Sequence, residues 1–294
     1  MRRGSYRESL FCPGLLSNPL PAIQLARLKR QTDDLAAAFT QPEIFLRRLH
    51  DLLEFYADRT YRPGQAGVVT TLLPHYHVPQ PVLRQIEADL RPIIIAHFEQ
   101  GLALLDALWA DTHYESRLLA AILLGDAPLA PAEAIIERIS NWARPGVELS
   151  LLEVLLTRGS TRLLHEAYSL WLETIKLWLL STDRLVQAVG LRALQTFISD
   201  PTFQDLPAIF NVLSPLLQTA RSDLHPELLD VLQMLVKRSP SETAFFLRHV
   251  LTISTEAGTA RLIRKLLPSF SVPTQNSLRD MLQQNARTRH ESNL

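Results

Sequence analysis

Leucine-rich stretches recur along the whole chain, with apolar residues three or four positions apart. Residues 43–58 show the pattern clearly, since Leu46, Leu49 and Leu53 fall on one side of a helix. This spacing is typical of amphipathic helices. The sequence lacks alternating apolar and polar runs bounded by tight glycine turns, which would predict strands. We therefore predict an all-α protein.

The apolar pattern also gives the bounds of the expected helices. The longest is expected to kink at Pro92 or to divide into two helices. Thr112 and Glu115 have the spacing of a capping box at the start of a helix. The predicted helices cover residues 22–39, 43–58, 80–109, 112–125, 131–142, 147–157, 161–180, 183–199, 203–219, 225–238, 241–252, 256–267 and 274–286.

A period of about 40 residues appears in the second half of the chain. Asp183 and Asp223 each precede an apolar helix, and Pro201 and Pro240 each follow one. Paired helices at this period are typical of HEAT-like repeats. We therefore predict a HEAT-like helical-repeat solenoid, an α-superhelix in which each repeat packs on its neighbours.

The solenoid prediction divides the chain into three parts. Residues 1–75 are expected to form N-terminal helices that cap the solenoid. Residues 76–286 are expected to be the HEAT-like repeat domain. The polar residues 287–294 are expected to be a disordered tail.

Composition is that of a folded protein outside the membrane. Apolar residues make up 47% and charged residues 20% of the chain, as in globular proteins. No segment reaches 18 uncharged apolar residues, so we expect no transmembrane helix and no membrane partner, and a cytoplasmic location. The single cysteine, Cys12, excludes an intrachain disulfide and a thiolate-rich zinc site.

Charge is unevenly distributed although the formal net charge is zero. Residues 1–62 carry +3, residues 63–236 carry −8, and residues 237–294 carry +5. A protein that binds duplex DNA is expected to present a basic face, because phosphate contacts supply most non-specific affinity. The acidic middle of the chain disfavours that function.

Common catalytic motifs are missing from the sequence. We find neither a phosphate-binding glycine loop nor a G-x-S-x-G nucleophile elbow. His75 and His77 could be metal ligands, but no further ligand is evident nearby, and ordinary loop histidines are the preferred interpretation. We therefore predict no metal site and no small-molecule cofactor.

Two tryptophans seven residues apart, Trp171 and Trp178, share one helical face. Packing in the core is the preferred interpretation. A platform on which bases stack is the alternative.

Four segments, in their order and spacing, resemble the bacterial DNA alkylation repair family, the HEAT-like alkylpurine DNA glycosylases. They are HYHVPQPVLRQIEADL (75–90), LWADTHYESRLLAAILLG (108–125), ISNWARPGVELSLLEVLL (139–156) and VLQMLVKRSPSETAFFLRHVL (231–251). The resemblance implies a helical-repeat fold and, for an active member, excision of alkylated bases from DNA.

The resemblance also implies an aspartate shortly after the tryptophan at residue 142, where a carboxylate would stabilise the cationic sugar. In this chain Trp142 is followed by Ala143, Arg144, Pro145 and Gly146, and the nearest acid is Glu148. The family's aromatic residue and arginines on a later helix correspond to residues 185–188, which read Leu-Val-Gln-Ala.

Two functions remain as hypotheses. The first is a non-catalytic protein, expected to be a monomer, that binds a macromolecule on its concave face. The second is a DNA glycosylase that binds duplex DNA; if the chain is an enzyme, this is the reaction we expect. In that case Trp109, Arg117, Trp142 and Arg144 would contact DNA, and Glu148 would be the candidate catalytic residue.

Overall fold

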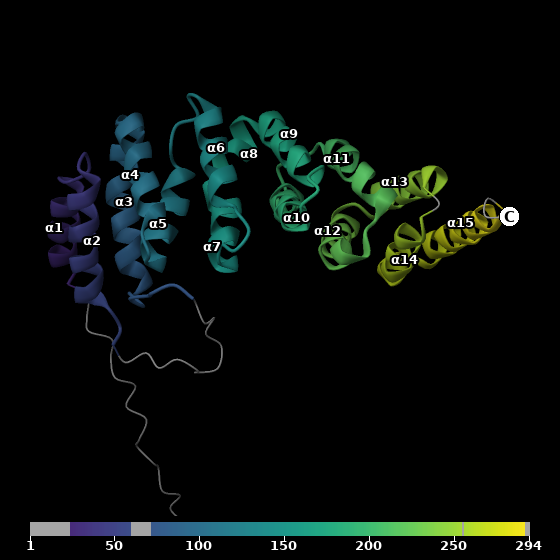
Figure 1. Ribbon diagram of the computed structural model, residues 1–294, viewed down its shortest axis with the longest axis horizontal. Helices are drawn as coiled ribbons and strands as arrows, with labels where there is room; N and C mark the ends of the chain where they lie inside the picture. Colours follow the sequence, from purple (N-terminus) through teal and green to yellow (C-terminus); the bar gives the residue numbers. More distant parts are fainter. Residues whose placement is uncertain (1–23, 60–71, 255, 292–294) are drawn as a thin grey trace, which may run out of the picture.

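The computed structural model describes residues 24–59, 72–254 and 256–291, and for residues 288–291 the backbone alone (Figure 1). All regular secondary structure in these ranges is helical, as predicted. Cys12 and the predicted start of the first helix, residues 22 and 23, lie outside the described residues. Among the described residues, no helix combines the length and apolar character needed to cross a membrane.

Short links join most of the helices, whereas residues 57–79 separate α2 from α3. In chain order they are α1 (Leu25–Ala36), α2 (Pro42–Tyr56), α3 (Gln80–Ala96), α4 (Phe98–Ala110), α5 (Tyr114–Leu124), α6 (Ala132–Trp142), α7 (Leu149–Val154), the π-helix η1 (Leu155–Gly159), α8 (Thr161–Glu166), α9 (Tyr168–Leu179), α10 (Arg184–Ser199), α11 (Leu206–Thr219), the 3₁₀-helix η2 (Ser222–Leu224), α12 (His225–Arg238), α13 (Pro240–Ile253), α14 (Ala257–Leu266), the 3₁₀-helix η3 (Leu267–Ser269) and α15 (Val272–Glu291).

Alternate helices pack side by side, which produces two rows. One row runs α1, α3, α5, η1, α10, α12 and α14, each in contact with the next. In the other, α2 packs on α4, and α9, α11, α13 and α15 follow one another. Figure 1 shows the helices in chain order along a curved row, with α10, α12 and α14 on the inner side of the bend and α9, α11 and α13 on the outer side.

One hydrophobic core continues through both rows, from Leu28 in α1 to Leu282 in α15. The leucines that defined the sequence pattern are its members, for example Leu49 and Leu53, which are fully buried. Trp171 is also fully buried, which confirms its interpretation as a core residue. Helices α1 and α2 pack on α3 and α4, so the expected cap and repeat domain share this core.

The long predicted helix over residues 80–109 divides, but not at its proline. Pro92 lies inside α3, and the break falls at His97, whose φ of −129° and ψ of 68° are not helical. After the break α4 lies close to the end of α3, since a Cβ at Gly101 would lie 3.3 Å from Ile94 Cγ2. The missing side chain at residue 101 therefore allows the tight turn.

Three other details of the predicted elements are wrong. The predicted helix 161–180 is two helices, because Ala167 adopts φ −142° and ψ 38° between them. The capping box at Thr112 does not form: α5 begins at Tyr114 without a side-chain cap, and Glu115 Oε1 instead accepts a hydrogen bond from the Tyr76 backbone N–H at 2.9 Å. Asp223 lies in η2 rather than at the start of α12.

The predicted start of α10 is confirmed. Asp183 is its N-cap, and its Oδ1 accepts a hydrogen bond from the Leu185 backbone N–H at 2.8 Å. This bond satisfies one of the amides that a helix leaves without an internal partner. At the other end of the chain, α15 continues to Glu291, so it overlaps the segment 287–294 that was expected to be a tail.

Candidate functional site

Trp109 and Trp142 lie together, and their rings stack on each other. Trp109 is near the end of α4 and Trp142 is the last residue of α6, and their rings stack with centroids 4.7 Å apart and an angle of 6° between the planes. Trp142 is only 6% exposed. One face of each ring is therefore covered by the other, and the pair joins α4 to α6.

The two candidate arginines make local contacts. Arg117 Nε donates a hydrogen bond of 2.7 Å to the Asp111 carbonyl oxygen, which holds the link between α4 and α5. Arg144 is exposed, and its Nη2 donates to Asn141 Oδ1 at 2.9 Å on the preceding helix. Arg144 therefore presents charge at the surface, whereas Arg117 has a structural contact.

Glu148, the candidate catalytic residue, is the N-cap of α7 and is half-buried. Its Oε1 accepts a weak hydrogen bond from Ser150 Oγ at 3.3 Å. Its Oε2 is buried and has no hydrogen-bond partner among the described residues. An unpaired buried carboxylate oxygen is costly, so this residue is the one candidate whose surroundings need a further explanation.

A groove with polar and apolar lining lies elsewhere among the described residues, between the segment α7–η1–α8 and helix α10. It is a groove of about 500 Å³ that Met234 of α12 closes at one side. We call it the hydroxyl groove because five of its lining residues are serines or threonines. The groove is lined by Leu149, Glu153, Leu156, Thr157, Ser160, Thr161, Leu164, His165, Arg192, Gln195, Thr196, Ser199, Asp200 and Met234.

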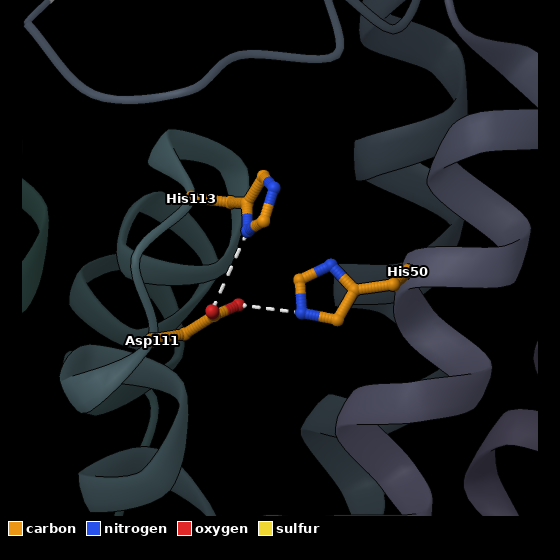
Figure 2. Close-up of side chains that lie close together, drawn as sticks. All are labelled: His50, Asp111 and His113. Atoms are coloured by element: carbon orange, nitrogen blue, oxygen red, sulfur yellow. Dashed lines mark hydrogen bonds and ion pairs between the residues drawn. The ribbon is translucent and has the colours of Figure 1, made fainter.

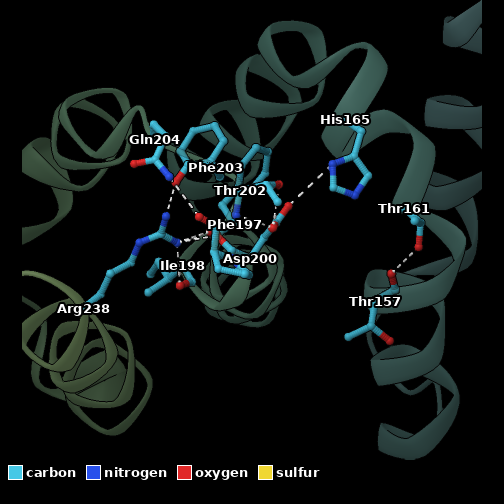
Figure 3. Close-up of polar contacts among 11 residues, drawn as sticks. Thr157, Thr161, His165, Phe197, Ile198, Asp200, Thr202, Phe203, Gln204 and Arg238 are labelled. Atoms are coloured by element: carbon cyan, nitrogen blue, oxygen red, sulfur yellow. Dashed lines mark hydrogen bonds and ion pairs between the residues drawn. The ribbon is translucent and has the colours of Figure 1, made fainter.

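The π-helix aligns one wall of the hydroxyl groove. The wall residues recur every fourth position, from Leu149 to His165. In an α-helix four residues turn about 400°, so such positions drift by about 40° at each step. The wider turn of η1, with its i→i+5 bonds, reduces that drift and keeps Thr157, Thr161 and His165 along one side (Figure 3).

The hydroxyl hydrogens of this groove point inward, to the backbone. Thr157 Oγ1 donates to Glu153 O at 2.7 Å, and Thr161 Oγ1 lies 3.0 Å from Thr157 O. Ser160 donates to Leu156 O at 2.6 Å. On the opposite wall, Thr196 Oγ1 donates to Ala193 O at 2.6 Å. A hydroxyl has a single O–H, so Thr157, Thr161 and Thr196 can offer a ligand their oxygen lone pairs but no proton, whereas Ser160 is only 1% exposed.

Asp200 stands at the far end of the hydroxyl groove (Figure 3). Its Oδ1 accepts hydrogen bonds from the N–H and hydroxyl of Thr202, at 2.8 and 2.7 Å. His165 Nδ1 lies 3.5 Å from its other oxygen. Desolvation alone would raise the pKa of Asp200, but the bonds from Thr202 and the nearby His165 hold that pKa below its ordinary value. The carboxylate is therefore charged at neutral pH.

Arg238 fixes the turn that carries Asp200. Its Nη1 donates to the carbonyl oxygens of Phe197, Ile198 and Asp200, at 3.0, 2.8 and 2.6 Å. Its Nη2 donates to the carbonyl oxygen of Phe203. These are carbonyls that the end of α10 leaves without helical partners. One guanidinium thus holds the end of α10 and the far end of the hydroxyl groove in place.

Sequence reasoning did not identify the hydroxyl groove or a second cluster, formed by His50, Asp111 and His113 (Figure 2). The four-residue spacing of Thr157, Thr161 and His165 was a usable signal for one wall of the groove. No signal linked His50 to Asp111, because they are far apart in the sequence. His75, weighed above as a ligand, lies instead beside Glu115, with Nδ1 2.8 Å from Oε1.

Comparison with known proteins gives one family and one solved structure. The model of a family described as DNA alkylation repair enzyme matches residues 51–265. No curated protein matches the chain. The crystal structure of an engineered protein is 17% identical, with a TM-score of 0.35, over 89% of this chain and 97% of that one. That likeness is too weak to inform the fold.

Proposed function

We propose that this chain, which belongs to the DNA alkylation repair enzyme family, is a non-catalytic member that binds a polypeptide segment in the hydroxyl groove. The observation that carries the proposal is the direction of the groove's hydroxyl groups. Those of Thr157, Thr161 and Thr196 donate to the backbone and leave only oxygen lone pairs for a ligand. Such a wall suits a ligand that brings its own N–H donors, as a polypeptide does.

The arrangement of helices supports this proposal. The two rows of alternate helices support the proposal of a HEAT-like solenoid, a fold whose curved inner surface is suited to binding another macromolecule. The hydroxyl groove lies on η1, α10 and α12, which are consecutive members of one row. A segment lying along them would contact several repeats at once.

Charge and donor chemistry disfavour DNA in the same groove. A phosphate is an acceptor and is held by N–H and O–H donors or by cations. Among the ionisable residues of the lining, Arg192 is the single permanent cation, and it is balanced by Glu153 and Asp200. Residues 63–236, which contain the groove, carry −8.

Site-specific photocrosslinking tests the proposal. A benzophenone amino acid would replace Thr161, in the groove, or Leu177, which is 69% exposed on α9 outside it. We expect the protein with the probe at residue 161 to give a discrete protein adduct in its native cells, and the protein with the probe at residue 177 to give none. Adducts of nucleic acid at residue 161, or equal adducts at both positions, would contradict the proposal.

Enzyme activity is tested separately. The chain should release no methylated purine from alkylated duplex DNA at high protein concentration. It should also show no salt-sensitive shift of duplex DNA at about 50 mM salt, where phosphate contacts are strong.

Glycosylase activity is the second candidate function, and one observation favours it. The buried Oε2 of Glu148 has no hydrogen-bond partner among the described residues, as expected of a carboxylate kept for a cationic transition state. If this function is present, Glu148→Gln should abolish base release while the fold is retained. Ser150→Ala, which removes the neighbouring hydroxyl, would be the matched control.

A further inference from the structure

Three potential metal ligands converge where α2 meets the link between α4 and α5 (Figure 2). His50 comes from α2, and Asp111 and His113 come from the link. His50 Nε2 lies 3.0 Å from Asp111 Oδ2, and His113 Nδ1 lies 3.5 Å from Asp111 Oδ1. One donor atom from each residue can be chosen so that all three lie within 4.8 Å of one another.

These separations match those around a tetrahedral ion. Zinc–nitrogen and zinc–oxygen bonds of about 2.0–2.1 Å place neighbouring ligand atoms about 3.3 Å apart. The distances from His50 Nε2 to Asp111 Oδ2 and from His113 Nδ1 to Asp111 Oδ1, 3.0 and 3.5 Å, lie on either side of that value, with each histidine beside a different oxygen of the carboxylate. Small side-chain rotations of His50 and His113 would bring the third pair to it.

The contact between His50 and Asp111 is not a hydrogen bond. Asp111 Oδ2 is buried and has no partner of ordinary hydrogen-bond geometry among the described residues, although His50 Nε2 lies 3.0 Å away as an ion pair and the Ser116 hydroxyl is beside the carboxylate. A cation bound between this nitrogen and this oxygen would contact both. A buried acceptor without a donor is costly, and a cation at that point would remove the cost.

Tyr76 holds both imidazole rings. Its hydroxyl lies 3.0 Å from His50 Nδ1, the nitrogen that faces away from Asp111. Its ring stacks on His113, with centroids 4.8 Å apart and an angle of 16° between the planes. Metal-binding histidines are characteristically held through their other ring nitrogen in this way, which fixes the tautomer.

The two histidines of the cluster are more exposed to solvent than the aspartate. The Asp111 side chain is 9% exposed, whereas those of His50 and His113 are 27% and 26% exposed. An ion can therefore enter between the two histidines, and water can complete its coordination.

We propose that His50, Asp111 and His113 bind one divalent transition-metal ion, with Zn²⁺ as the preferred ion. Two neutral imidazoles and one carboxylate are a ligand set suited to this class of metal. The ion joins α2 to the α4–α5 link, two parts of the chain separated by the segment that contains residues 60–71. This site is independent of the hydroxyl groove and of the function proposed there.

Zinc titration of the full chain tests the proposal. After removal of bound metal with a chelator, competition against a chromophoric zinc indicator should show one site per chain. Substitution of Zn²⁺ by Co²⁺ should produce the intense visible bands of a tetrahedral site. Both measurements use the native protein, so they do not depend on the folding of a variant.

Variants identify the ligands. His113→Asn and His50→Asn each remove a ligand and should weaken zinc binding by more than about 100-fold. Tyr76→Phe removes a supporting residue and should weaken it by ~10–100-fold. His165→Ala, a histidine of the hydroxyl groove, is the control and should bind zinc like the native chain. Circular dichroism would verify that each variant is folded.

Two results would overturn the proposal. The first is the absence of a one-to-one zinc site and of tetrahedral Co²⁺ bands in the native chain. The second is equal zinc affinity in the native chain and in folded His50→Asn and His113→Asn. Either result would leave the cluster as an ion pair that joins the helices.

Discussion

Trp142 packs face to face on Trp109, and this contact joins the last turn of α6 to the last turn of α4. Trp142→Ala should therefore lower the free energy of unfolding by about 3–5 kcal/mol, the cost of a large cavity. Urea denaturation would measure the loss. Arg144→Ala, two residues away on the surface, should change it by less than about 0.5 kcal/mol. A stable Trp142→Ala that lost binding to a ligand would instead show that the ring serves the ligand.

Asp89 should make the protein sensitive to acid. Its carboxylate accepts hydrogen bonds from Gln85 Nε2 at 2.9 Å within α3, and from Lys29 Nζ at 2.7 Å and Thr32 Oγ1 at 2.5 Å, which join α1 to α3. Desolvation raises the pKa of Asp89, but these three bonds outweigh it and hold the pKa below the ordinary 3.8. A depressed pKa contributes stability above 3.8 that is lost as the pH falls through the folded-state value.

Asp89→Asn measures that contribution. At pH 7 it should destabilise the protein by about 1–3 kcal/mol, because the buried Thr32 and two more exposed donors lose a charged acceptor. The difference from the native chain should shrink as the pH falls below 3.8, which urea midpoints at several pH values would show. Asp33→Asn is the control: Asp33 also pairs with Lys29, but its side chain is 57% exposed, so it should have little effect. A pH-independent difference would contradict the explanation.

Gly125 allows α5 to end against the π-helix. A Cβ at this position would lie 1.9 Å from the Arg158 carbonyl oxygen. Gly125→Ala should therefore force the two backbones apart and cost about 3 kcal/mol, at the upper end of overpacking effects. Thermal unfolding would measure it. Gly146→Ala is the matched control, because a Cβ there would meet no atom within 4 Å. Its φ of +94° is unfavourable for alanine, so this substitution should cost about 1 kcal/mol.

Arg238 should control local order at the end of α10. Arg238→Ala leaves four carbonyl oxygens without their donor, which should cost about 2–4 kcal/mol. Arg238→Lys should recover part of the loss, because an ammonium cannot reach all four. Amide hydrogen exchange should accelerate around residues 197–203 in both variants and remain unchanged in Lys237→Ala. Unchanged exchange in Arg238→Ala would mean that the turn is held by other contacts.

The helices could be predicted from the sequence because their signals are local. The spacing of leucines and the cap at Asp183 act within a few residues, and both are confirmed. The breaks at His97 and Ala167 were not predictable in the same way. They depend on how closely one helix approaches the next, as the contact of Gly101 with Ile94 shows.

The candidate site was harder to predict because it depends on contacts between helices. The glycosylase hypothesis expected Trp109 and Trp142 to contact DNA, but no sequence pattern showed that each ring would cover the other. His50 and His113 lie on elements separated by two further helices in the chain. Their meeting follows from the packing of α2 beside α4, which a linear pattern does not contain.

The π-helix at residues 155–159 sets how far the side chains of α8 are rotated about the helix axis relative to those of α7. Removal of one residue there would let α7 and α8 continue as one regular α-helix. Every side chain that follows would then rotate by about 100° relative to α7. A one-codon deletion would thus rotate Thr161 and His165 out of line with Glu153 and change one wall of the hydroxyl groove.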